Sequence, residues 1–284
     1  MPELPEVETV RYELAEKIIG LKIRKITVNQ IKMLKNISPA KFTSRLEGKT
    51  IKDVLRKGKY IIVDLVPKLQ LVIHLGMTGI LIHPHIENTI KNVRYSIKPK
   101  HNHLIFVFTD NSRMVFNDVR RFGKVFLVRH LTEIDSIKNL GLEPLDGEFT
   151  PESLFNIIEM NPKKRIKSLM MNQQLIAGLG NIYANEVLYR AGIHPMRLAS
   201  SLAENDAVIL CKQIKHVLDR AIQLKGSTIS DGAFRDTDGK QGKFRQEIMV
   251  YARKGEKCLK CHNQIEMVKI DGRSSFYCPG CQKL

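Results

Sequence analysis

The feature of this sequence that most constrains its fold is the spacing of the cysteines near its end. The segment "CLKCHNQIEMVKIDGRSSFYCPGC" has the form C-x2-C-x16-C-x2-C. Two close pairs joined by a spacer of hairpin length can place four thiolates around one tetrahedral ion. We therefore predict one Zn2+ ion bound by Cys258, Cys261, Cys278 and Cys281. Four protein ligands leave no open position, so the expected ion is structural.

Between the two cysteine pairs, "VKIDGRSSFYC" is typical of a strand, a turn at Asp271-Gly272 and a second strand. Arg273 is expected at the tip of this hairpin. A cation on a rigid, metal-clamped turn is well placed for a phosphate, but an ordinary solvated arginine fits the spacing equally well. Two redox-active CxxC pairs are the alternative for the cysteines, and the duplication argues against them.

The charge of the chain points to a polyanionic partner. The sequence has 46 Lys and Arg against 29 Asp and Glu, a formal net charge of +17. Such a balance favours nucleic acid over a membrane surface, although basic proteins need not bind either. No apolar run approaches the roughly 20 residues that span a bilayer. The acidic N-terminus lacks the features of a signal peptide, and we expect a cytoplasmic protein.

The first 130 residues are expected to form a β-rich domain with one N-terminal helix. A helix is predicted from Pro5 to Gly20, because apolar residues recur at helical spacing and a proline and a glycine suit its two ends. The following segments "KITV", "KYIIVDLV", "LQLVIHL", "HLIFVF", "RMVF" and "KVFLVR" are typical of strands. A β-sandwich or barrel is the expected architecture.

The middle of the chain is predicted to be helical. "TPESLFNIIEM", "NIYANEVLYRAG" and "SSLAENDAVILCKQIKHVLDRAIQLKG" have helical periodicity, and a capping box from Ser201 to Glu204 is expected to open the third. Cys211 lies on the apolar face of that helix and is interpreted as a small buried hydrophobe. Residues 227–245 lack periodicity and suggest a long mobile loop. We thus divide the chain into 1–133, 134–226, 227–245 and 246–284, an α+β multidomain protein.

Several segments could contact nucleic acid, each with a plainer alternative. "AGLGNIYANE" places a Gly-x-Gly-Asn turn before a helix, which suits a phosphate but also a simple tight connection. "NPKKRIK" has four cations that could equally form a solvated face. "FNDVRRFGK" and "HLGMTG" present Phe122 and Met77 on turns, where apolar wedges would be used, although Phe122 could belong to the core. "KPKHNHL" has two histidines, without the spacing of a metal site.

Together these motifs resemble one family. "MPELPEVETVR", "RKGKY", "HLGM", "DVRRFG", "GLGNIYANE" and the four-cysteine finger occur in this order, so the chain resembles the bacterial formamidopyrimidine-DNA glycosylases along its whole length. The resemblance implies an N-terminal β-sandwich, a helix-two-turn-helix domain and a zinc-finger β-hairpin. It also implies a DNA repair enzyme that removes oxidised purines, such as 8-oxoguanine and formamidopyrimidines, and then cuts the strand by β,δ-elimination.

The resemblance gives the first residues a catalytic role. Once Met1 is removed, Pro2 has a free secondary amine whose ordinary pKa is near ~8, so part of it is a neutral nucleophile at physiological pH. In the family this proline attacks C1′ of the damaged nucleotide and forms a Schiff base. Glu3 matches the neighbouring acid that handles protons at the sugar, and Glu6 a supporting position. For Glu8 we retain a role in capping the helix dipole.

Further residues match family positions. Lys59 matches the lysine credited with proton transfer in β-elimination, whereas Lys57 does not match. Arg273 matches the arginine that binds the phosphates flanking the lesion. The expected DNA contacts are His101, Lys163 and Asn181. Base flipping leaves a hole in the duplex, and the residues that match those filling it are Met77, Arg120 and Phe122.

Two points of lesion recognition follow from the resemblance. Residues 227–245 correspond to the loop that closes over the everted base. Thr78 stands where some family members have a Glu proposed to touch the damaged base, which leaves the fine lesion preference open.

Two rival functions share most of these features. An endonuclease VIII-like glycosylase for oxidised pyrimidines would have the same start and finger, but "PELPEVE" and the three hole-filling residues favour the purine branch. A non-catalytic DNA-binding protein would keep the charge and the finger. The expected partner in every case is damaged double-stranded DNA, and we expect a monomer that is associated with the nucleoid and does not bind membranes.

Overall fold

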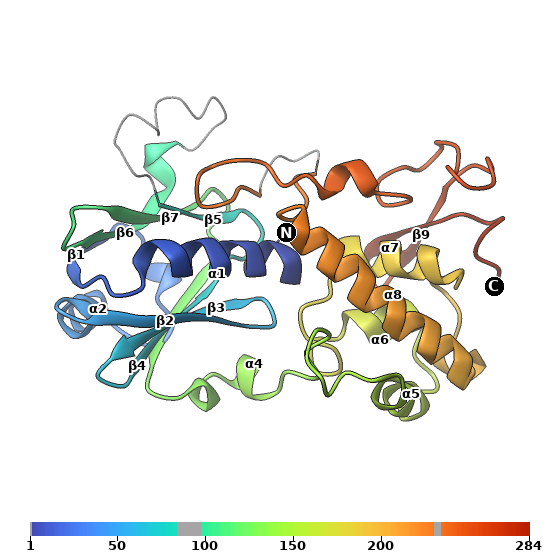
Figure 1. The fold of residues 1–284 in the computed structure, drawn as a ribbon, viewed down its shortest axis with the longest axis horizontal. Helices are drawn as coiled ribbons and strands as arrows, with labels where there is room; N and C mark the ends of the chain where they lie inside the picture. The colour runs from blue at the N-terminus through green and yellow to red at the C-terminus, as the bar shows by residue number, and fades with distance from the viewer. Residues whose placement is uncertain (1, 84–97, 230–233) are drawn as a thin grey trace. The chain divides into compact units, whose positions relative to one another are not determined.

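The structure, a computed structural model, describes residues 2–83, 98–229 and 234–284. The chain divides into two compact units, Met1–Lys138 with Leu224–Arg245, and Asn139–Gln223 with Gln246–Leu284 (Figure 1). No helix in these described ranges is both long and apolar enough to cross a membrane.

The first unit contains two four-stranded antiparallel sheets, with strand orders β2-β3-β4-β8 and β1-β6-β7-β5. The strands are β1 (Ile23–Val28), β2 (Thr50–Lys57), β3 (Tyr60–Val66), β4 (Leu69–His74), β5 (Gly79–Ile82), β6 (Asn102–Phe108), β7 (Arg113–Asp118) and β8 (Lys124–Val128). The helices are α1 (Leu4–Ile18), α2 (Pro39–Leu46) and the short α4 (Asp135–Lys138). The inner faces of the two sheets share one apolar core, as the sandwich prediction requires.

Helix α1 packs into this core as its periodicity predicts. Val7, Val10, Leu14 and Ile18 are all fully buried. The helix begins at Leu4, one residue before the expected start, and Gly20 follows it in the left-handed region with φ of +84°. Only Pro2 and Glu3 therefore precede the helix in the described part of the chain.

Several elements of the first unit, among them β2, β5 and α2, were absent from the sequence prediction. Strand β2 was missed because "TIKDVLRK" places charged residues beside each other, and a register shift between Ile51 and Asp53 breaks its alternation. Helix α2 was missed because its eight residues bury only Phe42 and Leu46. Strand β2 and helix α2 are recognisable only from their packing partners.

The second unit contains four helices and one hairpin. The helices are α5 (Pro151–Glu159), α6 (Ile166–Met171), α7 (Asn181–Ala191) and α8 (Glu204–Gln223), and the hairpin strands are β9 (Glu266–Ile270) and β10 (Arg273–Tyr277). Across both units, single 3-10 turns occur at Ile31–Met33, Pro99–His101, Leu131–Glu133, Ala199–Ser201 and Phe244–Glu247. Thr150 caps α5 by accepting a hydrogen bond from Ser153 N, as predicted.

The predicted capping box of α8 is wrong. Ser201 ends a 3-10 turn and its hydroxyl donates to Leu198 O instead of capping the helix. Asp206 provides the reciprocal bond, because its carboxylate accepts from Ala203 N at 3.0 Å. Cys211 on this helix is buried, as expected for a small core residue.

Residues 224–245 belong to the first unit and are bound to α1 on both sides of positions 230–233, which lie outside the described residues. Buried Glu13 accepts hydrogen bonds from Lys225 Nζ at 2.6 Å, Thr237 N at 3.0 Å and Thr237 Oγ1 at 2.8 Å. Lys17 Nζ donates to Asp238 Oδ1 at 2.5 Å. The described ends of this segment are thus fastened to one helix.

Candidate functional site

The candidate residues divide between the two units. Pro2, Glu3, Glu6, Lys59, Met77, His101, Arg120 and Phe122 lie in the first, and Lys163, Asn181, Arg273 and the four cysteines lie in the second.

The start of α1 holds Pro2 and Glu3 in a buried, hydrogen-bonded position. Glu3 is the N-cap residue, and Glu6 Oε2 accepts from Glu3 N at 2.8 Å, so the two acids form a capping box. Pro2 and both carboxylates are buried. Met1, whose removal the sequence analysis requires, lies outside the described residues.

Glu6 also binds the segment that follows α8. Its Oε1 accepts from Ser227 N at 2.7 Å. Gly226 has φ of +74°, and a Cβ there would come within 2.8 Å of Glu6 Oε1. A glycine is therefore required for this close approach. One carboxylate joins the backbone of Glu3 to the base of residues 227–245.

Glu8 does more than the helix-dipole role that the sequence suggested. It forms ion pairs with Arg11 and with Arg56, the latter at 2.9 Å. Arg56 Nη1 in turn donates to Gly58 O at 3.0 Å, in the turn that carries Lys59. Burial opposes ionisation of Glu8, but the two arginines outweigh it and lower its pKa. This chain of contacts, which the sequence did not reveal, links α1 to the Lys59 turn.

The register of the sheet brings three turns to the same end. Tyr60 on β3 lies opposite His74 on β4, and His74 lies opposite Lys124 on β8. Three turns therefore lie at the same end of these strands: the turn before Tyr60, the turn after His74 and the turn before Lys124. These turns carry the candidates Lys59, Met77 and Phe122 respectively. Lys59 itself is buried, with 7% of its surface exposed.

His74 lies at this end of the strands and is neutral. Its Nδ1 accepts from Gly76 N at 3.0 Å, which shapes the turn that presents Met77. Burial, followed by the nearby ammonium groups of Lys59 and Lys124, lowers the pKa of His74 to about 4. Nothing in the motif "HLGM" itself indicates this role for the histidine.

Thr78 and Asp118 join the Met77 turn to the loop that carries Arg120 and Phe122. Thr78 Oγ1 donates to Asp118 Oδ1 at 2.5 Å and accepts from Arg120 N at 3.1 Å. Asp118 Oδ2 accepts from Gly123 N at 2.8 Å, and Asp118 is fully buried. Thr78 is thus part of the scaffold of the two loops.

Arg120 and Phe122 are exposed and in contact with each other. The Arg120 guanidinium lies 4.7 Å from the centre of the Phe122 ring, and about half of Phe122 is exposed to solvent. Arg121 between them has φ of +59°, so the loop turns sharply at this point. An exposed aromatic residue with a cation over its face is suited to stacking, and the core alternative for Phe122 is excluded by its exposure.

His101 is the last residue of the 3-10 turn before β6. Its Nδ1 is enclosed and has no hydrogen-bond partner in the described part of the chain. Its ring lies 6.4 Å from that of His103, whose Nε2 is 2.7 Å from Asp118 O.

In the second unit, Lys167 has a structural role that its sequence does not indicate. It belongs to "NPKKRIK", for which a nucleic-acid contact and a solvated face both stayed open, but only 1% of its surface is exposed. Its Nζ donates to Asn181 Oδ1 at 2.7 Å, Ser274 O at 3.0 Å and Ser275 Oγ at 2.6 Å. Lys167 therefore fastens α6 to the start of α7 and to β10.

Asn181 and Arg273 lie on either side of this lysine. Asn181 Nδ2 donates to Ser274 O at 3.1 Å, which orients the amide at the first position of α7. Asp271 and Gly272 form the predicted two-residue turn, with φ of +48° and +74°, and Ile270 pairs with Arg273 across it. Arg273 is exposed beside a cavity of about 160 Å³ that Lys167 also lines. Lys163 is exposed.

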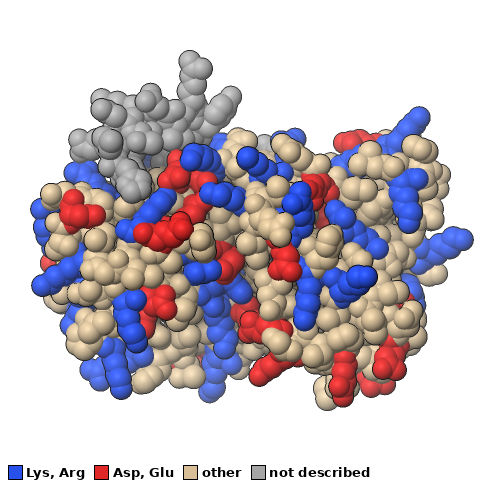
Figure 2. Space-filling model, in the orientation of Figure 1, with Lys and Arg blue, Asp and Glu red and all other residues tan. Residues whose placement is uncertain are grey.

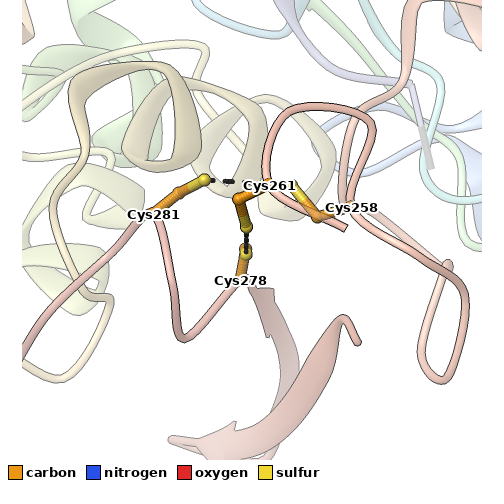
Figure 3. A group of neighbouring side chains, drawn as sticks. All are labelled: Cys258, Cys261, Cys278 and Cys281. Atoms are coloured by element: carbon orange, nitrogen blue, oxygen red, sulfur yellow. Dashed lines mark hydrogen bonds between the residues drawn. The ribbon is translucent and has the colours of Figure 1, made fainter. Parts of the chain in front are cut away.

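The four cysteines fit one tetrahedral zinc ion. Their sulfurs all lie within 4.8 Å of one another, and Figure 3 shows the side chains converging from two knuckles. Zn–S bonds of about 2.3 Å would separate the sulfurs by about 3.8 Å. The observed separations are 3.8 Å for Cys258–Cys281 and 3.2 Å for Cys261–Cys278. His262 is exposed and not among the converging ligands.

One thiol of the four is already predisposed to ionise. Burial works against the thiolate of Cys258, but hydrogen bonds from Tyr189 and from the backbone of Cys261 and Lys260 lower its pKa to about 6. Tyr189 OH lies 3.2 Å from its sulfur. These donors are the outer-shell contacts that support a thiolate ligand.

Sequence comparison finds three domain families along the chain. Residues 1–125 match the formamidopyrimidine-DNA glycosylase N-terminal domain, residues 140–232 the formamidopyrimidine-DNA glycosylase H2TH domain, and residues 255–284 a zinc finger found in FPG and IleRS.

Relatives and solved structures match over the full length. The formamidopyrimidine-DNA glycosylase of Carboxydothermus hydrogenoformans is 40% identical, with 100% of both chains covered, and that of Wolbachia pipientis is 41% identical, covering 99% of this chain and 100% of the relative. The MutM (Fpg) protein of Thermus thermophilus has a TM-score of 0.86 at 36% identity, covering 99% and 98% of the two chains. A Lactococcus lactis FPG mutant in complex with Fapy-dG containing DNA has a TM-score of 0.88 at 34% identity, covering 100% of both.

Proposed function

The chain belongs to the family of formamidopyrimidine-DNA glycosylases, and from this premise we propose that it excises oxidised purines from DNA and cuts the resulting abasic strand. Its substrates are 8-oxoguanine and formamidopyrimidine lesions, because solved relatives are complexes with DNA containing carbocyclic 8-oxo-G and Fapy-dG. It acts as a monomer on damaged double-stranded DNA, in the cytoplasm and associated with the nucleoid.

Pro2 is the nucleophile of the proposed reaction. Its neutral secondary amine donates an electron pair to C1′ of the damaged nucleotide, and the base leaves with the electrons of the glycosidic bond and a proton. The amine then loses its own proton, and its electron pair forms the C1′–N double bond while the C1′–O4′ bond breaks and O4′ takes up a proton. The resulting ring-opened, cationic iminium joins Pro2 to C1′. Glu3 handles the protons at the sugar, and Glu6 orients it through the hydrogen bond to Glu3 N.

The iminium acidifies the C2′ proton and so permits strand cleavage. Removal of that proton leaves an electron pair that forms the C1′–C2′ enamine and then expels the 3′ phosphate. Lys59 supports this proton transfer. Arg273 binds the phosphates that flank the lesion and assists the second elimination, which releases the 5′ phosphate. Hydrolysis of the remaining adduct returns the Pro2 amine.

The other candidates bind the duplex around the reacting nucleotide. Met77 and Phe122 replace the stacking lost when the lesion is everted, and Arg120 donates hydrogen bonds to the orphaned base. His101, Lys163 and Asn181 contact backbone phosphates. Residues 227–245 cover the everted base. The four-part division at 133, 226 and 245 separates the parts with these tasks.

The observation that carries this proposal is the agreement of full-length sequence identity with the geometry at the start of α1. Pro2 precedes a helix whose capping box uses Glu3 and Glu6, and Glu6 also binds the segment after α8. Once Met1 is removed, the secondary amine of Pro2 at the start of this buried helix supplies the nucleophile that the proposed reaction needs.

Excision from two substrates tests the proposed activity. We expect release of 8-oxoguanine opposite cytosine to be faster than release of thymine glycol, measured under single-turnover conditions on duplexes of equal length. Faster removal of thymine glycol would instead assign the chain to oxidised pyrimidines.

A further inference from the structure

A groove in the second unit is lined by none of the proposed catalytic or DNA-binding residues, although the zinc ligand Cys281 contributes to its wall. It has a volume of about 760 Å³ and is bounded by the end of α7, one face of α8 and the first cysteine knuckle. A groove of this size accommodates a few side chains of a bound ligand.

The floor of the groove is apolar. Tyr189, Ala191, Met249 and Leu259 contribute to its lining. Leu259 has 62% of its surface exposed, although it stands between two zinc ligands in "CLKC". A metal-clamped knuckle fixes the backbone on both sides, so this side chain cannot withdraw into the core. An exposed leucine beside other apolar side chains is typical of a surface that binds a partner.

The rim of the groove is cationic. Arg190, Lys212 and Lys260 all line it, and no carboxylate of the described residues does. Glu247 directs its carboxylate to Arg220 at 2.6 Å and offers Arg190 only its backbone oxygen at 3.3 Å. The buried carboxylate of Glu186 offsets part of the charge of Arg190. Lys212 and Lys260 are exposed and form no ion pair in the described part of the chain, so the rim keeps their positive charge.

The groove lies at the far ends of the elements that carry the proposed DNA contacts. Asn181 opens α7 and Ala191 closes it, which separates them by roughly 15 Å at 1.5 Å per residue. Arg273 stands at the tip of the β9–β10 hairpin and the cysteines at its base, roughly 16 Å apart for five extended residues. A ligand in the groove would leave both contacts accessible.

We propose that this groove binds an acidic, amphipathic peptide segment of a partner protein. Apolar side chains of the peptide would contact Leu259 and Met249, and its carboxylates would pair with Lys212, Lys260 and Arg190. A single-stranded nucleic acid would need several exposed aromatic rings for stacking, and the described lining offers only the imidazole of His216, because Tyr189 is 6% exposed. A second copy of this chain, at +17, would be repelled by the rim.

Fluorescence anisotropy on the full-length, zinc-loaded protein tests this proposal. The probe is a fluorescein-labelled octapeptide with five Asp and three Leu residues, compared with an Asp-to-Asn version, a Leu-to-Ser version and an oligothymidylate of equal charge. We expect saturable binding of the first peptide in the micromolar range and at least tenfold weaker binding of both altered peptides. Lys260→Glu and Leu259→Ser should each weaken binding at least tenfold.

The control variant is Lys254→Glu, an exposed lysine of the same unit outside the groove lining, which should leave peptide binding within twofold. Binding of a lesion-containing duplex should be unchanged by Leu259→Ser, which also shows that the finger is folded. A dissociation constant above about 1 mM for the Asp-Leu peptide overturns the proposal. Equal competition by oligothymidylate, with Leu259→Ser without effect, would make the groove a nucleic-acid surface. A dimer in sedimentation that Lys260→Glu dissociates would make the occupant a second copy.

Discussion

At the scale of single residues, the positions that most affect the site are buried polar groups whose role depends on their partners. Lys167, Asp118 and Glu8 each join two elements through hydrogen bonds that no spacing rule in the sequence predicts. Lys167 shows the difficulty most clearly, because four cations in seven residues resemble a solvated face. A buried ammonium costs free energy unless all its hydrogen bonds are made, and here three acceptors satisfy it.

Lys167→Met should destabilise the second unit. The change removes three hydrogen bonds and leaves Ser274 O without a charged donor, so we expect a loss of about 2–4 kcal/mol in the free energy of unfolding. Urea denaturation followed by circular dichroism measures it. The matched control is Lys163→Met, an exposed lysine four residues earlier, which should keep full stability and reduce the salt dependence of DNA binding by about one phosphate contact. Equal stability of the two variants would contradict the assigned role.

His74 should make the first unit sensitive to acid. Its folded pKa of about 4 lies below the unfolded value of 6.5, so between these values the unfolded chain binds a proton that the folded chain does not. Stability is complete above pH 6.5 and falls as the pH is lowered toward 4, by roughly 2 kcal/mol at pH 5. Urea midpoints of wild type and His74→Asn at pH 7, 6 and 5 measure this. An acid loss of the same size in both proteins would refute it.

At the scale of elements, local signals in the sequence predicted what local interactions determine. The stripe of α1, the Thr150 cap, the Asp271-Gly272 turn and the cysteine pairs all depend on residues close in sequence, and the structure confirms each. The predicted Ser201 capping box is wrong because Ser201 belongs to a 3-10 turn. The carboxylate of Asp206 accepts the hydrogen bond at the start of the helix instead. Strand β2 was missed because its pairing with β3 determines its conformation, and its own sequence lacks a regular alternation of apolar and polar residues.

Glu13 should affect base excision more than cleavage of abasic DNA. In Glu13→Ala, residues 225 and 237 lose their common acceptor on α1, so the segment proposed to cover the base loses one contact with this helix on each side. The segment keeps the bonds of Ser227 to Glu6 and of Thr237 and Asp238 to Lys17. An abasic site has no base to cover, and its cleavage should be within twofold of wild type. Release of 8-oxoguanine should fall at least tenfold, measured on the same preparation.

The matched control for Glu13 is Glu16→Ala, an exposed acid on the same helix, which should leave both activities unchanged. Glu13→Gln keeps an acceptor for Thr237 and should recover part of the excision rate. A parallel loss of both activities in Glu13→Ala would show a general loss of folding in place of a positioning role.

Removal of zinc should abolish DNA binding. The four thiols form a closed site with no position for substrate, so the ion holds the hairpin that carries Arg273. We expect chelation to raise the Kd for a lesion-containing duplex at least tenfold, and zinc addition to restore it, as measured by anisotropy. A chelated protein that binds the duplex as tightly as the zinc-loaded form would contradict this role.

At the scale of the whole molecule, the charge of +17 is a property that neither unit's fold requires. Figure 2 shows Lys and Arg side chains spread over the visible face of both units, with acidic residues between them. A distributed positive charge supports sequence-independent binding that weakens with salt. The proposed chemistry depends instead on a few buried positions, such as Pro2 and Lys59, which charge alone could not reveal.

The functional assignment as a whole was accessible from the sequence because its motifs are spread over the full chain. What sequence could not provide is how the motifs are held, since Glu6, Glu8 and Asp118 act through partners as far away as residue 227. Contacts between distant segments have no local signature, which is why the scaffold of the site emerged only with the structure.

Borohydride trapping tests the central claim, that the amine of Pro2 forms a covalent intermediate with the damaged strand. Sodium borohydride reduces an iminium to a stable amine, so wild-type protein with Met1 removed should become attached to DNA containing 8-oxoguanine, seen as a shifted band after denaturing electrophoresis and as a Pro2 adduct by mass spectrometry. Pro2→Gly and a form that retains Met1 should trap poorly while still binding the duplex. An unmodified Pro2 protein that binds the lesion but yields no adduct, or an adduct at another residue, would contradict the account.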